Sequence, residues 1–281
     1  MPELPEVETV KNALIPVLTG RTIVRSELFS PAMRTPLSPL KKALPGRKIL
    51  NLRRRARYIA AELDDRKFLV IHLGMTGVVR VENSSVPRRK HEHVFLHLDN
   101  GMIFRFEDVR RFGELEVHPA GKKGLPEKFD AFGPEPLSDD FTAEYLFGSS
   151  RNVRGAVKNF IMDNAVVSGI GNIYATETLF AAKIDPRFPA GSLTRNQCGK
   201  IVEHSRRILK DAIAAGGTTI ADFRHVDGSE GKFAVALLIY GKTGEPCPVC
   251  GTELKSVKIG GRTSVFCPRC QKQRISRSGR A

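Results

Sequence analysis

The sequence predicts an α+β protein of two domains, in which a β-sandwich with an opening helix precedes a helical domain and a cysteine-rich β-hairpin. Three observations support this fold class. The chain has 281 residues, which suits two domains better than one. Its apolar pattern changes from short strand-like runs to helical periodicity near residue 133. Four of its five cysteines form two C-x-x-C pairs close to the end.

The β-sandwich is predicted from residues 20–117. Short alternating or apolar runs recur there at residues 48–52, 58–63, 68–73, 94–98 and 102–106, and turn formers such as Asp64-Asp65 separate them. Ahead of them, Pro5 in a first turn and apolar residues at Val7, Val10 and Leu14 predict a helix with one buried face. Residues 1–132 are therefore expected to form the amino-terminal domain.

The second half is predicted to be helical. A Pro-rich acidic linker covers residues 133–141, and helical stretches follow near residues 142–147, 153–163, 173–182 and 194–215. We assign residues 142–236 to this domain, including a glycine-rich loop at 216–231. A hairpin module at 237–273 and a flexible basic tail at 274–281 complete the chain.

The charge balance indicates a polyanionic partner. Lys and Arg number 45 against 30 Asp and Glu, giving a formal charge of +15 and a pI near 9.9. Nucleic acid fits this balance best, while simple solubility or an acidic membrane surface are the alternatives. The opening residues lack a secretory signal and no apolar run is long enough to span a bilayer, so a soluble, cytoplasmic protein is expected.

The paired cysteines predict one structural zinc ion. Sixteen residues separate the two pairs, and each C-x-x-C lets two thiolates reach one tetrahedral ion. The intervening residues alternate around Gly260-Gly261, as in a β-hairpin. Four thiolates leave no open position, which argues against zinc catalysis. A redox dithiol is the alternative, but no thioredoxin-like pattern surrounds the pairs. The expected ligands are Cys247, Cys250, Cys267 and Cys270, and Cys198 is expected to be inert.

A glycine-lined turn precedes Asn172. Gly169 and Gly171 lead into an apolar helix, and backbone N–H groups at such a helix start can bind phosphate. The same pattern is also how many ordinary helices begin. From these residues alone, anion binding and simple capping remain open alternatives.

Several motifs in order resemble the formamidopyrimidine-DNA glycosylase family. They are the opening Pro2 to Val7, His72 to Gly77, Arg110 to Gly113, Gly169 to Ala175 and the cysteine hairpin. The resemblance runs from residue 2 to about residue 273, and the Leu4-Pro5 opening favours this family over the related endonuclease VIII. It implies an amino-terminal β-sandwich, a helix-two-turn-helix unit around Asn172, a zinc hairpin, and a monomer that acts on damaged duplex DNA at the bacterial nucleoid.

The resemblance also implies base excision repair through the amine of Pro2. Such an enzyme excises formamidopyrimidines and 8-oxoguanine, then cleaves the strand by β,δ-elimination. An α-amine with a pKa near 8 is about 10% neutral at pH 7, far more than a lysine side chain. With Met1 removed, Pro2 is the expected nucleophile, Glu3 the general acid/base, and Glu6 a supporting residue or only a favourable charge at the helix start.

The resemblance assigns further side chains to DNA. Met75, Arg110 and Phe112 match the family's gap-filling residues, because extrusion of a base leaves a gap that apolar wedges can fill. Phosphate binding is expected of His91, Arg110, Arg111, Asn172 and Arg262, with Arg154 and Lys158 as further contacts. Arg262 is also expected to assist the second elimination. The loop at 216–231 resembles the family's loop over the flipped base.

One residue departs from the family pattern. Arg57 stands before Tyr58 where the family normally has Lys, a residue implicated in phosphate contact and in proton transfer, so the resemblance places Arg57 among the catalytic residues. A guanidinium binds phosphate well but is a poor proton donor. We therefore hypothesise that 8-oxoguanine is excised less efficiently than ring-opened purines.

Two other classes of protein compete with this interpretation. A DNA-binding protein without catalysis would retain the basic surface and the hairpin but would not need the Pro2-Glu3 pair. A zinc-dependent nuclease is disfavoured because four cysteines fill the metal's coordination sphere.

Overall fold

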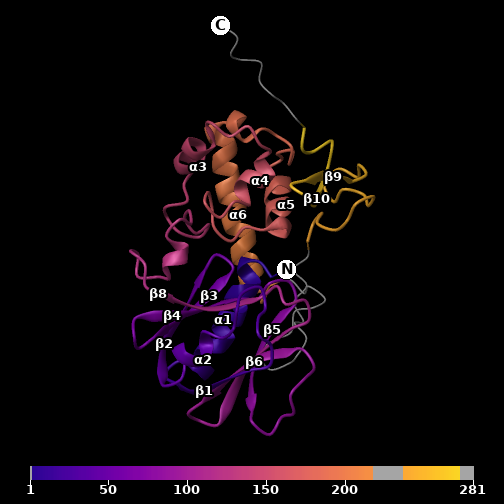
Figure 1. Cartoon of the computed structure of the whole chain (residues 1–281). Coiled ribbons are helices and arrows are strands. Elements are labelled where there is room, and N and C mark those ends of the chain that lie inside the picture. The colour runs from indigo at the N-terminus through magenta and orange to yellow at the C-terminus, as the bar shows by residue number, and fades with distance from the viewer. Residues whose placement is uncertain (1, 218–236, 273–281) are drawn as a thin grey trace. The chain divides into compact units, whose positions relative to one another are not determined.

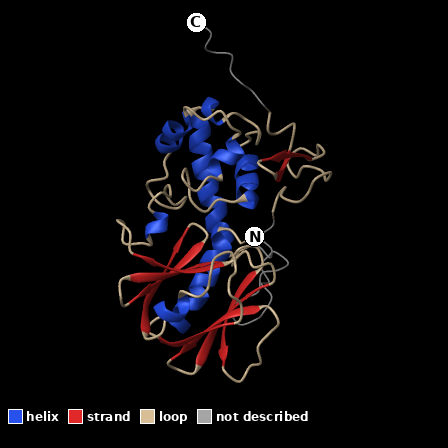
Figure 2. Ribbon diagram, viewed as in Figure 1, coloured by secondary structure: helices blue, strands red, loops and turns tan. Residues whose placement is uncertain are grey.

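The computed structural model describes residues 2–217 and 237–272 and separates them into two compact units (Figure 1). Of the described residues, the N-terminal unit contains 2–131 and 212–217, and the C-terminal unit contains 132–211 and 237–272. The predicted α+β class is confirmed: strands dominate the first unit and helices the second (Figure 2). The predicted loop at 216–231 lies outside the described residues from 218 onward, as does the tail at 274–281.

The N-terminal unit is built on one antiparallel sheet of eight strands in the order β5-β7-β6-β1-β2-β3-β4-β8. Only two residue pairs, Thr22 with Lys48 and Ile23 with Arg47, join β1 to β2, so the sheet consists of two halves. The elements are α1 (Leu4–Leu18), β1 (Thr22–Leu28), α2 (Leu40–Ala43), β2 (Arg47–Arg55), β3 (Tyr58–Leu63), β4 (Lys67–His72), β5 (Gly77–Asn83), β6 (Glu92–Leu98), β7 (Met102–Asp108), β8 (Glu114–Pro119) and the 3₁₀ turn η1 (Glu127–Phe129).

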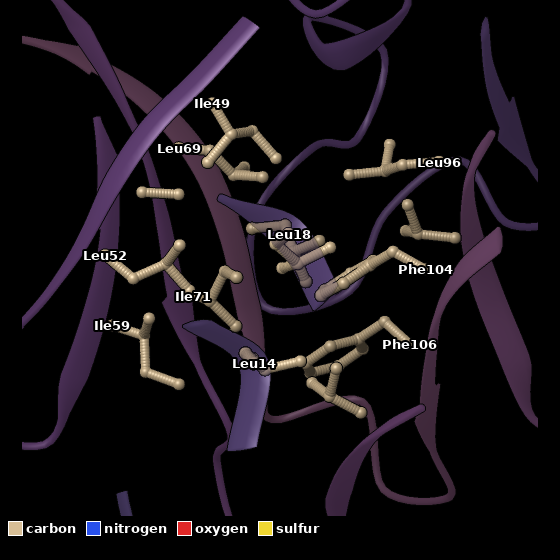
Figure 3. Packing of buried hydrophobic residues seen from close by; sticks show 14 of the residues in the cluster. Leu14, Leu18, Ile49, Leu52, Ile59, Leu69, Ile71, Leu96, Phe104 and Phe106 are labelled. Carbon is tan, nitrogen blue, oxygen red and sulfur yellow. The ribbon is translucent and has the colours of Figure 1, made fainter. Parts of the chain in front are cut away.

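Both halves of the sheet and α1 contribute to one hydrophobic core. The predicted apolar face of α1 is confirmed, since Val7, Val10 and Leu14 are at most 4% exposed. Figure 3 shows Leu14 and Leu18 of α1 between side chains of the two halves. The labelled neighbours are Ile49, Leu52, Ile59, Leu69 and Ile71 from one half and Leu96, Phe104 and Phe106 from the other. Packing of α1 against both halves fixes where its first turn lies.

The C-terminal unit contains four helices and a two-stranded hairpin among its described residues. They are α3 (Ala143–Ser150), α4 (Val157–Ile161), α5 (Asn172–Ala181), α6 (Arg195–Ala214), the 3₁₀ turn η2 (Ala190–Ser192), β9 (Lys255–Ile259) and β10 (Arg262–Phe266). The helix predicted over 153–163 is shorter than expected. The chain before α4 pairs instead with a distant segment, because Gly155 and Val153 accept the N–H groups of Ala190 and Gly191 at 2.9 Å each.

The segment predicted as a linker, residues 133–141, is anchored to the C-terminal unit. The guanidinium of Arg206 on α6 donates to the carbonyl oxygens of Ser138 at 2.6 Å and Phe141 at 3.0 Å. The N–H of Gly133 donates to the carbonyl of Asn164 at 2.8 Å. These bonds satisfy backbone groups that a Pro-rich segment cannot pair within a helix.

In the described part of the chain, no helix combines the length and the apolar character needed to cross a membrane.

Candidate functional site

The first turn of α1 buries two carboxylates beside Pro2. Glu3 is 2% exposed and Glu6 is not exposed at all. The backbone N–H of Glu3 donates to Oε2 of Glu6 at 2.8 Å, so the Glu6 side chain satisfies an N–H at the helix start that the carbonyl groups of the helix cannot reach. The sequence suggested dipole stabilisation or support for Glu6, and the structure adds this specific bond. Glu6 therefore fixes the backbone directly after Pro2.

A glycine packs against the same carboxylate. A Cβ added to Gly217 would lie 3.2 Å from both Cα and Cγ of Glu6. Gly217 also has φ of +84°, a conformation that favours glycine. The end of the segment after α6 thus contacts the first turn of α1 within the N-terminal unit. Sequence reasoning missed this contact because 211 residues separate the partners along the chain.

Arg57 occupies a tight turn between β2 and β3. Arg55 and Tyr58 pair across the hairpin, which leaves Ala56 and Arg57 as the two turn residues. Arg54 donates to the carbonyl of Ala56 at 3.0 Å and to Glu8 of α1 at 2.7 Å. The turn that presents Arg57 is therefore tied to α1, the helix that carries Glu3.

Two neighbouring loops present the predicted wedge residues. Met75 lies between β4 and β5 and is 38% exposed, while Phe112 lies between β7 and β8 and is 45% exposed. The guanidinium carbon of Arg110 is 4.7 Å from the centre of the Phe112 ring. Both apolar side chains are therefore accessible to a partner. The structure thus brings the predicted trio together, with Arg111 in the same loop at a φ of +56°.

His91 lies at the end of the loop between β5 and β6. Its carbonyl accepts the N–H of Asp108 at 2.9 Å, which ties this loop to β7. Arg105, only 1% exposed, donates to the carbonyls of Val86 and Pro87 at 2.6 and 3.2 Å. Sequence reasoning missed Arg105 because an alternating strand gives no sign that an Arg points inward.

The helix α5 begins one residue earlier than a capping Asn172 would require. Gly171 is the N-cap and Asn172 is the first helical residue. The Nδ2 of Asn172 lies 3.5 Å from the hydroxyl of Tyr240, and among the described atoms its buried Oδ1 has no hydrogen-bond partner. A buried polar atom without a partner is uncommon in folded proteins.

The buried Glu177 of α5 anchors the segment that leads to the cysteines. Its carboxylate accepts the backbone N–H groups of Leu238, Ile239 and Tyr240 at 2.8–3.0 Å. Sequence reasoning missed Glu177, because only the fold brings its carboxylate close to these residues.

The four cysteines converge on one point. Their sulfur atoms all lie within 4.8 Å of one another, with 4.0 Å between Cys247 and Cys270 and 3.5 Å between Cys250 and Cys267. Four thiolates at about 2.3 Å from a tetrahedral zinc ion stand about 3.8 Å apart. The observed spacing fits that ion and is too long for disulfides. By contrast, burial raises the pKa of the isolated Cys198 to about 11, so its thiol stays protonated at neutral pH.

The hairpin β9–β10 rests on α4. Lys158 is 1% exposed, and its ammonium group donates to Oγ of Ser264 at 2.7 Å, so it does not lie on the surface as an exposed DNA contact would. The Gly260 turn fits closely against Asn159. Next to that turn, Arg262 begins β10 and is exposed, and Arg154 is exposed in the segment before α4. Of these three predicted DNA contacts, Arg154 and Arg262 are therefore accessible and Lys158 is not.

Comparison with known proteins assigns three parts of the chain to known domains. Residues 1–115 match the formamidopyrimidine-DNA glycosylase N-terminal domain, residues 132–224 its H2TH domain, and residues 244–273 the zinc finger found in FPG and IleRS. These three matches define a zinc-finger DNA glycosylase architecture.

Full-length relatives agree with this assignment. The chain is 43% identical over 279 residues to the formamidopyrimidine-DNA glycosylase of Pasteurella multocida and 47% identical over 277 residues to that of Pseudomonas putida; each comparison covers 97% of this chain and 100% of the relative. The chain belongs to the formamidopyrimidine-DNA glycosylase family.

Solved structures show the same fold. A mutant of the Lactococcus lactis FPG in complex with DNA containing Fapy-dG superposes with a TM-score of 0.88 at 34% identity. MutM in complex with DNA containing carbocyclic 8-oxo-G superposes with a TM-score of 0.87 at 35% identity. Both cover 97% of this chain and 100% of the other. The family's zinc finger and the observed sulfur spacing together identify the cysteine cluster as a structural zinc site.

Proposed function

We propose that this protein removes oxidised purines, formamidopyrimidines and 8-oxoguanine, from duplex DNA and then cleaves the strand at the resulting abasic site. The observation that carries the proposal is the first turn of α1, where the buried Glu6 holds the backbone of Glu3 directly after Pro2. A protein that only bound DNA would have no need of the Pro2-Glu3 pair that this turn holds.

The chemistry begins with removal of Met1, which frees the secondary amine of Pro2. The neutral amine attacks C1′ of the damaged nucleotide, the bond from C1′ to the base breaks, and the base leaves after receiving a proton. The carboxyl group of Glu3 carries protons for the sugar ring oxygen and the leaving base. The attacking nitrogen then loses its proton to a carboxylate such as Glu3, and the C1′–O4′ bond of the sugar breaks as O4′ is protonated. Because proline is a secondary amine, the resulting open-chain adduct is an iminium cation that carries no N–H proton. This cation acidifies the neighbouring C2′ position, and elimination then expels the 3′ and 5′ phosphates.

DNA binding uses both units. The base must leave the stack before Pro2 can reach its sugar, and Met75, Arg110 and Phe112 fill the gap that remains. His91 and Arg111 in the N-terminal unit and Arg154, Asn172 and Arg262 in the C-terminal unit are the proposed phosphate contacts. The net charge of +15 supports such contacts. We place this activity in the bacterial cytoplasm, on nucleoid DNA, with the protein acting as a monomer.

The zinc ion has a structural part in this proposal. When bound by the four thiolates it fixes the ends of the hairpin, while Lys158 and the Glu177 carboxylate hold the hairpin and its leading segment to α4 and α5. Together they set the position of Arg262, which lies five residues before Cys267.

Borohydride trapping tests the proposal directly. Borohydride reduces an iminium to a stable amine, so the native protein is expected to form a covalent adduct with a duplex that contains 8-oxoguanine. Glu3→Gln should slow adduct formation on 8-oxoguanine by at least tenfold. Glu144→Gln removes a carboxylate that is 75% exposed and serves as the matched control.

Two outcomes would contradict the proposal. No adduct with native protein whose Met1 has been removed would indicate a DNA-binding protein without catalysis. A faster reaction on duplexes with oxidised pyrimidines than on those with oxidised purines would indicate specificity like that of endonuclease VIII.

A further inference from the structure

The two loops that present Met75 and Phe112 begin and end on neighbouring strands, because β4 pairs with β8 and β5 pairs with β7. Residues 73–76, named here the Met75 loop, connect β4 to β5, and residues 109–113, named the Phe112 loop, connect β7 to β8. His72 pairs with Glu114 where the loops meet β4 and β8, and Gly77 pairs with Asp108 where they meet β5 and β7. The loops are therefore held side by side at both ends by the strand register.

The carboxylate of Asp108 joins the two loops. One oxygen, Oδ1, accepts the hydroxyl proton of Thr76 in the Met75 loop and the N–H of Arg110 in the Phe112 loop, the latter at 3.2 Å. The other oxygen, Oδ2, accepts the N–H of Gly113 at 2.7 Å. Asp108 is completely buried, so water does not compete for these donors. Hydrogen bonds to a buried carboxylate are among the strong ones in proteins.

The backbones of the two loops are also in close contact. A Cβ on Gly74 would lie 2.5 Å from the carbonyl carbon of Phe112, so only glycine permits this approach. The N–H of Gly74 donates to Nδ1 of His72 at 3.2 Å. Burial, with the nearby charges of Arg57, Arg34 and Lys128, lowers the pKa of His72 to about 3, so the ring is neutral and its Nδ1 accepts at neutral pH.

We propose that Asp108 is a positioning residue that makes the two loops one rigid body, so that Met75, Arg110 and Phe112 enter the base stack together. The inference rests on the proposed function, because it assigns these side chains to the gap left by an extruded base. A preformed wedge loses less conformational entropy on insertion than three side chains on independent loops. Asp108 touches neither the reacting sugar nor the amine in this proposal, so its effect is confined to the step that opens the duplex.

The test compares a substrate that must be opened with one that lacks the damaged base. Asp108→Asn replaces one carboxylate oxygen with an NH₂ group that cannot accept, and Thr76→Val replaces the hydroxyl group with a methyl group. Single-turnover cleavage of a duplex with 8-oxoguanine paired to cytosine is expected to slow at least tenfold in both variants. Cleavage of a duplex with a preformed abasic site is expected to change less than twofold. Asp99→Asn, which alters an exposed carboxylate that accepts the N–H of Thr22 at 3.0 Å, should leave both rates unchanged.

A 2-aminopurine base placed beside the lesion reports the opening step itself, because its fluorescence rises when it is unstacked. In Asp108→Asn the rise should slow by the same factor as base excision. Equal slowing on both substrates, or a normal fluorescence rise in the variant, would overturn the positioning role. Native protein that cleaves neither substrate would instead refute the proposed function.

Hydrogen exchange of the free protein tests the rigid body without any DNA. In Thr76→Val, peptides from both loops should exchange faster, because loss of the bond from Thr76 to Asp108 loosens the carboxylate that also holds the Phe112 loop. Faster exchange in the Met75 loop alone would show that the loops are independent and would overturn the inference.

Discussion

Substitution of Gly217 tests whether the contact with Glu6 matters for catalysis. Gly217→Ala introduces a Cβ in a residue with φ of +84°, at 3.2 Å from Cα and Cγ of Glu6. Gly20→Ala is a matched control, because Gly20 has φ of +80° and a Cβ there would meet no described atom within 4 Å. The two variants share the backbone cost and differ only in the contact with Glu6.

The expected magnitudes follow from these two terms. The left-handed conformation costs an L-residue about 1–2 kcal/mol, so Gly20→Ala should lower the free energy of unfolding by that amount. The optimal separation of non-bonded carbon atoms is about 3.5–4.0 Å. In Gly217→Ala the buried Glu6 must therefore move away from the new Cβ by a few tenths of an ångström. Overpacking of a buried site adds about 1–3 kcal/mol.

Displacement of Glu6 is expected to move the proposed nucleophile, Pro2, because Glu6 holds the backbone of the adjacent Glu3 by a hydrogen bond. A misplacement of 1 Å at a reacting centre costs about 100-fold in rate, so a few tenths of an ångström should cost about three- to tenfold. Single-turnover borohydride trapping on an abasic duplex measures this rate, and denaturant unfolding measures stability. If Gly217→Ala traps DNA as fast as Gly20→Ala, the contact with Glu6 does not position Pro2 and the reasoning is wrong.

Three further predictions concern the lesion, the pH and the metal. In single-turnover assays, Arg57→Lys should raise the excision rate of 8-oxoguanine relative to that of ring-opened formamidopyrimidine. The reason is that a lysine ammonium can donate a proton, whereas a guanidinium is a poor proton donor. An unchanged ratio of the two rates would contradict this prediction. Since the pKa of His72 is lowered from 6.5 to about 3 mainly by burial, the unfolded chain binds the extra proton first, so stability should fall as the pH drops from 6.5 towards 3. His72→Asn retains an acceptor for the N–H of Gly74 but has no group that titrates in this range. Between pH 7 and pH 5 its denaturant midpoint should fall less than that of the native protein. An identical fall of the two midpoints would exclude His72 as the cause. Cys267→Ser should release zinc and weaken binding to duplex DNA at least tenfold, because the hairpin that carries Arg262 loses its anchor. Metal analysis and a DNA titration measure these effects, and full affinity in a zinc-free variant would refute the structural role of the ion.

Features that depend on neighbours in the chain were predictable from the sequence. The C-x-x-C pairs and the Gly260-Gly261 turn encode a zinc-bound hairpin within 24 residues, and the structure confirms both the strands and the clustered sulfur atoms. The apolar spacing of Val7, Val10 and Leu14 predicted the buried face of α1 because helical periodicity is local. The basic composition indicated a polyanionic partner without any knowledge of the fold.

Features that depend on distant segments required the tertiary structure. Residues 153–156 were predicted as helix because their local pattern permits it, but pairing with residues 189–191 prevails. The sequence suggested that Lys158 is a surface cation, but its ammonium group is buried against Ser264, 106 residues away along the chain.

The same division separates the residues of the site from their positions. Sequence by itself determined which side chains are available: an amine-bearing Pro2, carboxylates at Glu3 and Glu6, and apolar tips at Met75 and Phe112. Only the tertiary structure decided that Asp108 joins the loops bearing those tips and that Gly217 lies against Glu6. The physical reason is that hydrogen bonds and close contacts depend on distances in space, and chain spacing determines those distances only within a single helix, hairpin or turn.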